Sequence, residues 1–196
     1  MPLPFVFPYA LVFWLVYIWA YAPEMRIVHR AGRGASAPGS RDAGSMRVIM
    51  MGMGLASAAA FPLAWVTALR VPAPLQAGVF VVGMALLISG SLLRRHCWRQ
   101  LGKYFTGNVA AQVGQPVVTT GAYAWVRHPS YTAGTMMNVG IGLALGSWAS
   151  AGLLLVASLA VYDYRMKVEE RVLLETLGEP YRQYIAGRKR IIPFVH

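Results

Sequence analysis

Apolar residues arrive along this chain in long blocks, and polar stretches separate the blocks. Residues 5–22, 48–69 and 75–93 each reach the roughly 17–25 residues that a helix needs to cross a bilayer. A fourth stretch, residues 131–162, would be about 48 Å long as one helix, which exceeds a hydrocarbon core of about 30 Å. We therefore expect it to turn back at residues 146–147 as two helices of about fifteen residues each. The pattern predicts an all-α, polytopic membrane protein with about five transmembrane helices.

Prolines and glycines add detail to these helices. We expect the first apolar block to be a retained helix that ends at Pro23, and the second to kink at Pro62. The last two helices are short for independent spans, so we expect them to form a tight hairpin. Three small residues, Gly134, Gly140 and Gly142, would allow the two backbones of this hairpin to approach each other closely.

Polar stretches divide the rest of the chain. Residues 24–47 are rich in Arg, Gly, Ser and Pro, which is typical of a flexible basic loop, and residues 94–129 form a second loop of a length that is usually functional. Residues 163–196 are charged and amphipathic, and we expect them to lie on the membrane surface as a tail. The chain thus has three N-terminal helices, residues 1–93, and a catalytic region, residues 94–196.

The distribution of charge orients this protein. Only 13% of the residues are charged, against about 25% in a soluble domain, which favours a membrane protein over a water-soluble fold. All but one of the 18 Lys and Arg residues fall on the side of the loops and the tail, and Arg70 is the exception. The positive-inside rule makes that side cytoplasmic and places the N-terminus outside the cell inner membrane.

The net positive charge also indicates which classes of partner this protein has. Topology and anionic lipid headgroups account for the net charge of +11, so we expect membrane lipids as partners and no nucleic acid. Cys97 is the one cysteine, which excludes an intramolecular disulfide and a multi-cysteine metal site, and we expect no metal.

Two polar clusters flank the expected hairpin, and its turn would bring them to the same face of the membrane. In the first cluster, GAYAWVRHPSYTAG at 121–134, Pro129 suits the first position of a helix. The free N–H groups of that helix start, with Arg127 and His128 beside them, favour an anion such as a carboxylate. The alternative is that both side chains only anchor the helix at headgroup depth.

The second cluster, residues 163–184, contains two of the seven acidic residues as neighbours, Glu169 and Glu170. Carboxylates at the membrane boundary need a partner. Arg165 precedes Glu169 by four residues and can pair with it on one helix face. The alternative is that a cationic or hydroxyl-rich ligand supplies the partner.

Several motifs in the last ninety residues or so have the order and spacing of a known family. They are GAYAWVRHPSY at 121–131, Gly-Ser-Trp at 146–148, the Glu169-Glu170 pair, LGEPYRQY at 177–184 and IIPF at 191–194. With these motifs the chain resembles the isoprenylcysteine carboxyl methyltransferase family and its relatives, the phospholipid methyltransferases.

The resemblance implies an integral membrane methyltransferase that uses S-adenosylmethionine and a lipophilic acceptor, with a carboxylate as the expected nucleophile. It implies that a group of residues lines the cofactor site: His128, Tyr131, Gly134, Glu169, Glu170 and Tyr181. Arg165, Glu169 and His128 are the implied catalytic residues. Arg165 would orient a carboxylate acceptor, and His128 would serve as the base if the acceptor were an amine.

Two alternatives use the same helical scaffold. Membrane sterol reductases, which use NADPH, also carry an RHP motif, but Ser130 and the residues after it depart from their pattern. A non-catalytic membrane protein is the second alternative. The chain also departs from the methyltransferase pattern, because Ala122 stands where the family often has proline, and residues 187–190 replace an Arg-Val-Pro element of the tail.

Overall fold

The computed structural model describes residues 1–34, 42–105 and 114–191, and within these residues it contains α-helices, short 3₁₀ turns and no β-strand. The all-α prediction is therefore confirmed for the described part of the chain. The helices are α1 Tyr9–Gly34, α2 Ser45–Leu63, α3 Ala73–Leu101, α4 Pro129–Ala144, α5 Trp148–Leu177 and α6 Glu179–Ala186. The 3₁₀ turns are η1 Leu3–Phe5, η2 Thr67–Leu69, η3 Gly102–Tyr104 and η4 Gly121–Ala124.

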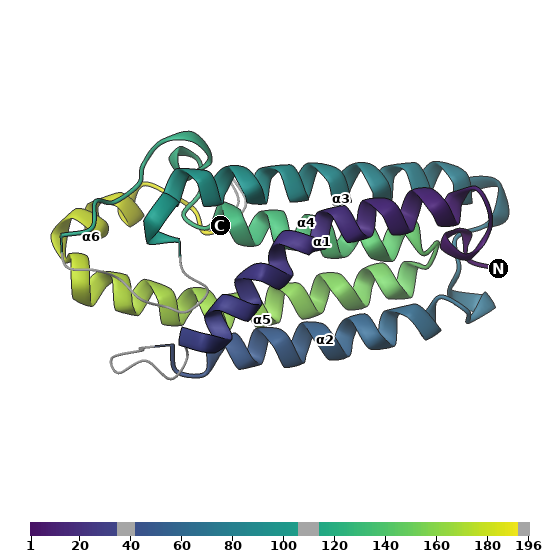
Figure 1. Ribbon diagram of the computed structural model, residues 1–196, viewed down its shortest axis with the longest axis horizontal. Coiled ribbons are helices and arrows are strands. Elements are labelled where there is room, and N and C mark those ends of the chain that lie inside the picture. Colours follow the sequence, from purple (N-terminus) through teal and green to yellow (C-terminus); the bar gives the residue numbers. More distant parts are fainter. Residues whose placement is uncertain (35–41, 106–113, 192–196) are drawn as a thin grey trace.

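Helices α1 to α5 form an elongated bundle, and α6 lies at the end opposite to the N-terminus (Figure 1). Helix α4 packs against both α3 and α5, α2 packs against α5, and α1 packs against α3. Helix α1 crosses the bundle obliquely, from the side of α3 toward the start of α2 (Figure 1). The apolar core lies along these contacts and includes Phe13, Leu87, Met137, Leu145 and Leu154.

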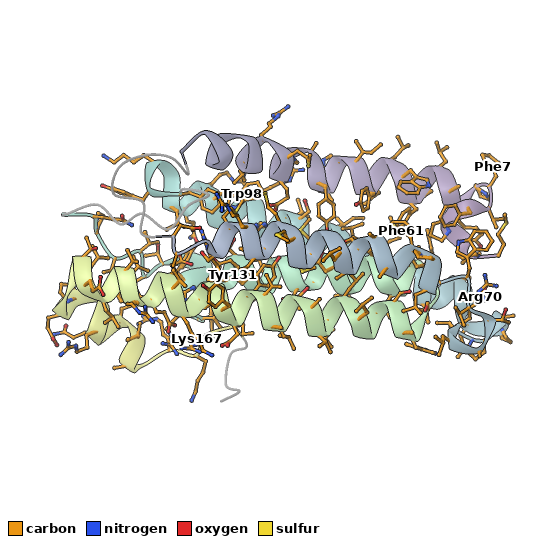
Figure 2. All side chains as sticks on the ribbon, turned by 90° about the horizontal axis from the view of Figure 1, so that it is seen from below. Phe7, Phe61, Arg70, Trp98, Tyr131 and Lys167 are labelled. Carbon is orange, nitrogen blue, oxygen red and sulfur yellow. The ribbon has the colours of Figure 1, made fainter. Side chains whose placement is uncertain are left out.

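Among the described residues, two helices are long and apolar enough to cross a membrane by their length and composition, α2 and the segment Ala73–Tyr104 that contains α3. Arg70, the cation expected on the outer side, lies at the opposite end of the bundle from Lys167 (Figure 2). This separation agrees with the charge pattern of the sequence. The count of five spans and the orientation in the membrane stay predictions.

The reversal expected at residues 146–147 is present. Gly146 has a φ of +70°, a conformation that glycine adopts without strain, and the Ser147 side chain accepts a hydrogen bond of 3.1 Å from the Ser150 N–H at the start of α5. Helix α4 has the expected length, at 16 residues.

The expected length of the second helix of the hairpin was wrong, because α5 has 30 residues and continues to Leu177. The charged residues after 162 include good helix formers, and the next glycine is Gly178, with a φ of +63°. The first half of the expected surface tail is therefore an extension of α5, and it contributes buried side chains such as Arg165 and Glu170.

The three small residues of α4 do pack closely, although not all against the same helix. A Cβ on Gly142 would lie 2.4 Å from the Ala151 Cα of α5, and one on Gly134 would lie 2.5 Å from the Tyr162 hydroxyl of α5. Both glycines serve the hairpin, as predicted. Gly140 instead faces α3, where an added Cβ would lie 2.6 Å from a backbone carbonyl oxygen.

The helix ends differ from the sequence pattern in two further places. Helix α1 does not end at Pro23 but continues to Gly34, so residues 24–34 are not a loop. The remainder of that expected loop up to 41 lies outside the described residues. Pro62 is the penultimate residue of α2, where it does not interrupt a longer helix. In membrane proteins, neighbouring helices can satisfy the backbone groups that a proline leaves free, which explains why Pro23 is tolerated.

Helix α3 also extends further than its apolar block, to Leu101. Its last turns carry long cationic side chains that reach polar or aromatic partners, and the Arg95 guanidinium lies 4.4 Å from the ring centre of Trp19 in α1. The expected loop from 94 to 129 therefore begins later in the structure, and its residues 106–113 lie outside the described part.

Candidate active site

A cavity of about 180 Å³ lies at the end of the bundle that carries α6, and all six helices contribute to its wall. Its ionic lining residues are Glu24, Arg94, Arg127, His128, Arg165 and Glu169. Its aromatic lining residues are Tyr104, Phe105, Tyr123, Tyr131, Tyr162, Tyr181 and Tyr184. The cavity thus combines charges of both signs with aromatic and apolar surface.

His128 lies directly before α4, and Pro129 is the first residue of that helix, as the sequence predicted. The side chain is buried, with 4% exposed. Its Nε2 lies 3.0 Å from Oε1 of Glu170, which accepts a hydrogen bond from it, and its Nδ1 lies 3.8 Å from Oε2 of Glu169. The hairpin therefore brings His128 and the acidic pair together.

The two neighbouring carboxylates have different surroundings. Glu169 borders the cavity, its side chain is 32% exposed, and its Oε2 accepts a hydrogen bond of 2.7 Å from the Tyr131 hydroxyl. The Glu170 side chain is only 10% exposed. Its two oxygens contact Arg127 at 3.1 Å and Arg190 at 2.8 Å, in addition to His128.

These contacts determine the ionisation of Glu170. Burial by itself raises the pKa of this carboxyl group, but hydrogen bonds from His128 and Arg190 and the positive charge of Arg127 outweigh it. The pKa of Glu170 is held at about 2, below its ordinary value. Glu170 is therefore a carboxylate at neutral pH, and it holds three basic side chains around the start of α4.

The segment after α6 closes this side of the site. The backbone N–H groups of Arg127 and His128 donate to the carbonyl oxygens of Lys189 and Arg190 at 2.8 and 2.9 Å. The Thr132 hydroxyl donates to the Ile191 carbonyl oxygen at 2.6 Å. The tail therefore lies against the start of α4, even though residues 187–190 depart from the family pattern. Sequence reasoning missed Arg190 because a short basic run gives no indication of a buried carboxylate partner.

Arg165 is buried at the wall of the cavity, with 4% of the residue exposed. Its Nη1 contacts Asp42, with which it forms an ion pair, and donates to the Ser45 hydroxyl at 2.6 Å. Its Nε donates to the Tyr131 hydroxyl at 3.3 Å, and that hydroxyl in turn donates to Glu169. The expected proximity of Arg165 and Glu169 is present, with Tyr131 between them. Asp42 was not predicted.

Gly134 and Tyr181 contribute to the cavity in different ways. Gly134 faces the Tyr162 hydroxyl, so its lack of a side chain leaves room for a ring that lines the cavity. Tyr181 of α6 lines the cavity directly and is 4% exposed. Burial raises the pKa of Tyr181, which keeps its hydroxyl protonated. Tyr184 anchors α6 because its hydroxyl donates to the Tyr123 carbonyl oxygen at 2.9 Å.

A further ion pair lies at the wall of the cavity and was also missed. Arg94 of α3 contacts both carboxylate oxygens of Glu24 in α1. The same guanidinium donates to the Ser130 carbonyl oxygen at 2.8 Å and to its hydroxyl at 3.0 Å. Because Arg94 and Glu24 are 70 residues apart, no local spacing indicates this contact. It joins α1, α3 and the start of α4.

Known proteins with related sequences share this region of the chain. Residues 81–175 match the model of the isoprenylcysteine carboxyl methyltransferase family. A protein-S-isoprenylcysteine O-methyltransferase of Schizosaccharomyces pombe is 31% identical over 132 residues, which cover 64% of this chain and 55% of the relative. The B enzyme of the same name from Arabidopsis thaliana is 28% identical over 116 residues, or 58% of this chain and 59% of the relative. The chain thus spans little more than half the length of these curated relatives.

A solved structure gives the same result for the fold. The eukaryotic intramembrane Ras methyltransferase, an isoprenylcysteine carboxyl methyltransferase, superposes with a TM-score of 0.56 at 28% identity, and the match covers 60% of this chain and 43% of that one. With α2 and the segment that contains α3, the match indicates an integral membrane fold. These matches are methyltransferases and do not support the reductase alternative. Through residues 81–175, which carry most of the cavity's ionic side chains, the chain is similar to the isoprenylcysteine carboxyl methyltransferase family.

Proposed function

We propose that this protein is a membrane methyltransferase that transfers a methyl group from S-adenosylmethionine to the carboxylate of a lipophilic acceptor of the isoprenylcysteine type. The observation that carries the proposal is the convergence of His128, Tyr131, Glu169 and Tyr181 on one cavity at the end of an apolar bundle. The names of the relatives, protein-S-isoprenylcysteine O-methyltransferases, support the reaction class.

The cavity has the groups that S-adenosylmethionine requires. Its amino group and ribose hydroxyls need acceptors, and the Glu169 carboxylate borders the cavity with 32% of its side chain exposed. Its carboxylate needs a cation, and Arg127 lines the cavity beside the start of α4. Its adenine ring and sulfonium favour aromatic faces, which Tyr131 and Tyr181 provide. The donor set therefore fits the cofactor.

The protein's own residues mainly align the reactants and exclude water. When bound, S-adenosylmethionine supplies a methyl group on a positively charged sulfur. The acceptor carboxylate is already a nucleophile, so its oxygen needs correct placement in line with that methyl group and no general base. Arg165, held by three polar partners, would orient this carboxylate. Aromatic rings around the cavity keep water away while the new ester bond forms.

A lipophilic acceptor is supported by the other wall of the cavity. Ile27 of α1 and Met46 and Ile49 of α2 line it on the side of the apolar helices. A long hydrocarbon chain in contact with these residues would place its polar end near Arg165, where the ionic part of the cavity begins. We further propose that this end of the bundle is cytoplasmic, because 17 of the 18 Lys and Arg residues are expected on this side and the positive-inside rule makes that side cytoplasmic.

The proposal is tested first by binding of S-adenosylhomocysteine to the purified protein in detergent, measured by calorimetry. We expect Glu169→Gln to weaken binding by about tenfold, the loss of one charge-assisted hydrogen bond. Glu179→Gln is the matched control, because Glu179 is exposed on α6, with 62% of its side chain accessible. Absence of any binding heat or thermal shift in the wild-type protein would contradict the methyltransferase proposal.

The acceptor class is tested with two probes that share a carboxylate. N-acetyl-S-farnesylcysteine should become methylated when radiolabelled S-adenosylmethionine is supplied, whereas N-acetylcysteine, which lacks the hydrocarbon chain, should not. Efficient methylation of the water-soluble probe would overturn the lipophilic part of the proposal and leave the methyltransferase part intact.

A further inference from the structure

Asp42 lies three residues before Ser45, the first residue of α2, in a part of the chain that the family match at 81–175 does not include. The residue is 8% exposed, although it is charged. Its Oδ2 accepts a hydrogen bond of 2.9 Å from the Met46 N–H, and its Oδ1 accepts one of 3.0 Å from the Ser45 hydroxyl. The Asp42 carboxylate thus accepts a hydrogen bond from a free N–H at the start of α2 and is directed into the protein.

This carboxylate meets Arg165 of α5, 123 residues further along the chain. The neighbouring residue, Tyr164, donates from its hydroxyl to the Ala43 carbonyl oxygen at 3.2 Å. Two consecutive residues of α5 therefore hold two consecutive residues before α2. The contact is built from several elements, and it fixes the Arg165 guanidinium at the wall of the cavity.

Two carboxylates lie within reach of Arg165. One is Asp42, and the other is Glu169, which follows Arg165 by four residues on the same helix, the spacing that brings side chains together. The Tyr131 hydroxyl lies between Arg165 and Glu169, at 3.3 and 2.7 Å. A buried guanidinium without a counter-charge is costly, so an Arg165 that loses Asp42 will turn toward Glu169.

We infer that Asp42 is a positioning residue of the active site: it neutralises Arg165 from the side of α2 and so leaves the Glu169 carboxylate available to a cationic group in the cavity. Without Asp42, Arg165 would occupy Glu169 and compete with the amino group of the ligand. The inference rests on the proposed binding of an adenosyl ligand at Glu169. It also makes the start of α2 a functional part of the site.

The test measures the affinity for S-adenosylhomocysteine in full-length protein by calorimetry. We expect Asp42→Asn to weaken binding by about tenfold. In a Glu169→Gln background the same change should cause no further loss, because Asp42 acts through Glu169. Glu179→Gln, which removes an exposed carboxylate from α6, is the control and should leave the affinity unchanged.

A role of Asp42 in stability alone would give a different pattern. The losses from Asp42→Asn and Glu169→Gln would then be additive, which would overturn the inference. If Asp42→Asn alone does not fold, Asp42→Glu keeps a carboxylate opposite Arg165 and should bind within about threefold of the wild-type protein. Weak binding by a folded Asp42→Glu variant would also overturn the inference, whereas a wild-type protein that does not bind would contradict the proposed function itself.

Discussion

Neutralising Glu170 and neutralising Glu169 should have different consequences, even though the two residues are neighbours. In Glu170→Gln, a carboxylate with 10% of its side chain exposed loses its charge beside Arg127, His128 and Arg190. In Glu169→Gln, a carboxylate with 32% exposure loses its charge at the border of the cavity. The first change should mainly lower stability, and the second should mainly lower affinity for the adenosyl ligand.

The size of the first effect follows from the partners of Glu170. Removing one member of a buried ion pair costs about 3–5 kcal/mol. Here Arg190 is 36% exposed and can regain water, and glutamine retains one hydrogen-bond acceptor. We therefore expect a loss of about 3 kcal/mol for Glu170→Gln, at the low end of that range. At about 2–4 °C per kcal/mol for a chain of this size, the melting temperature should fall by about 6–12 °C.

Glu169→Gln weakens the hydrogen bond that Glu169 accepts from the Tyr131 hydroxyl, at a partly solvated site. Its cost should be about 1 kcal/mol, or about 2–4 °C. Thermal unfolding of both variants in one detergent, with tryptophan fluorescence as the signal, gives the comparison. Calorimetry with S-adenosylhomocysteine, performed well below both melting temperatures, gives the affinities. Equal thermal shifts, or a larger shift for Glu169→Gln, would refute this assignment of the two carboxylates.

Three further predictions follow from other contacts. Gly142→Ala should lower the melting temperature of the purified protein because its Cβ would overlap the backbone of α5, whereas Gly152→Ala, with nothing within 4 Å, should not. The pKa of Glu170 is depressed to about 2, so the stabilisation that its carboxylate gives is complete above the unfolded-state pKa of about 4.3 and is lost as the pH falls toward 2. The difference in melting temperature between the wild-type protein and Glu170→Gln should therefore narrow between about pH 5 and pH 3. A difference that stays constant over this range would contradict the prediction. Glu24→Gln should lower the melting temperature by about 6–12 °C because it removes the carboxylate partner of Arg94. Arg94→Met, added to the Glu24→Gln variant, should restore part of that loss in melting temperature.

Local sequence signals were sufficient for much of the fold. Long apolar blocks predicted an all-α chain, Gly146 and Ser147 marked the reversal between α4 and α5, and Pro129 marked the start of α4. The same reversal brings His128 and the Glu169-Glu170 pair together, as expected. These features depend on the periodicity, the turn chemistry and the missing N–H of proline, which act over a few residues.

Helix ends were less well predicted than helix positions. The sequence pattern ended α5 where its apolar residues end, but a helix continues as long as its backbone hydrogen bonds and side-chain partners allow. Arg165 and Glu170 are tolerated in the continuation because they find counter-charges from other segments. Polarity alone therefore did not mark the end of the helix.

Which charges meet was decided only by the tertiary structure. Arg165 pairs with Asp42, Arg94 with Glu24 and Glu170 with Arg190, and each partner comes from a segment that sequence reasoning treated as a loop or a tail. The sequence by itself determined that this protein has apolar helices, a hairpin and two polar clusters at one end. Packing determined the partner of each buried charge, because burial requires a counter-charge but no local pattern specifies which distant segment supplies it.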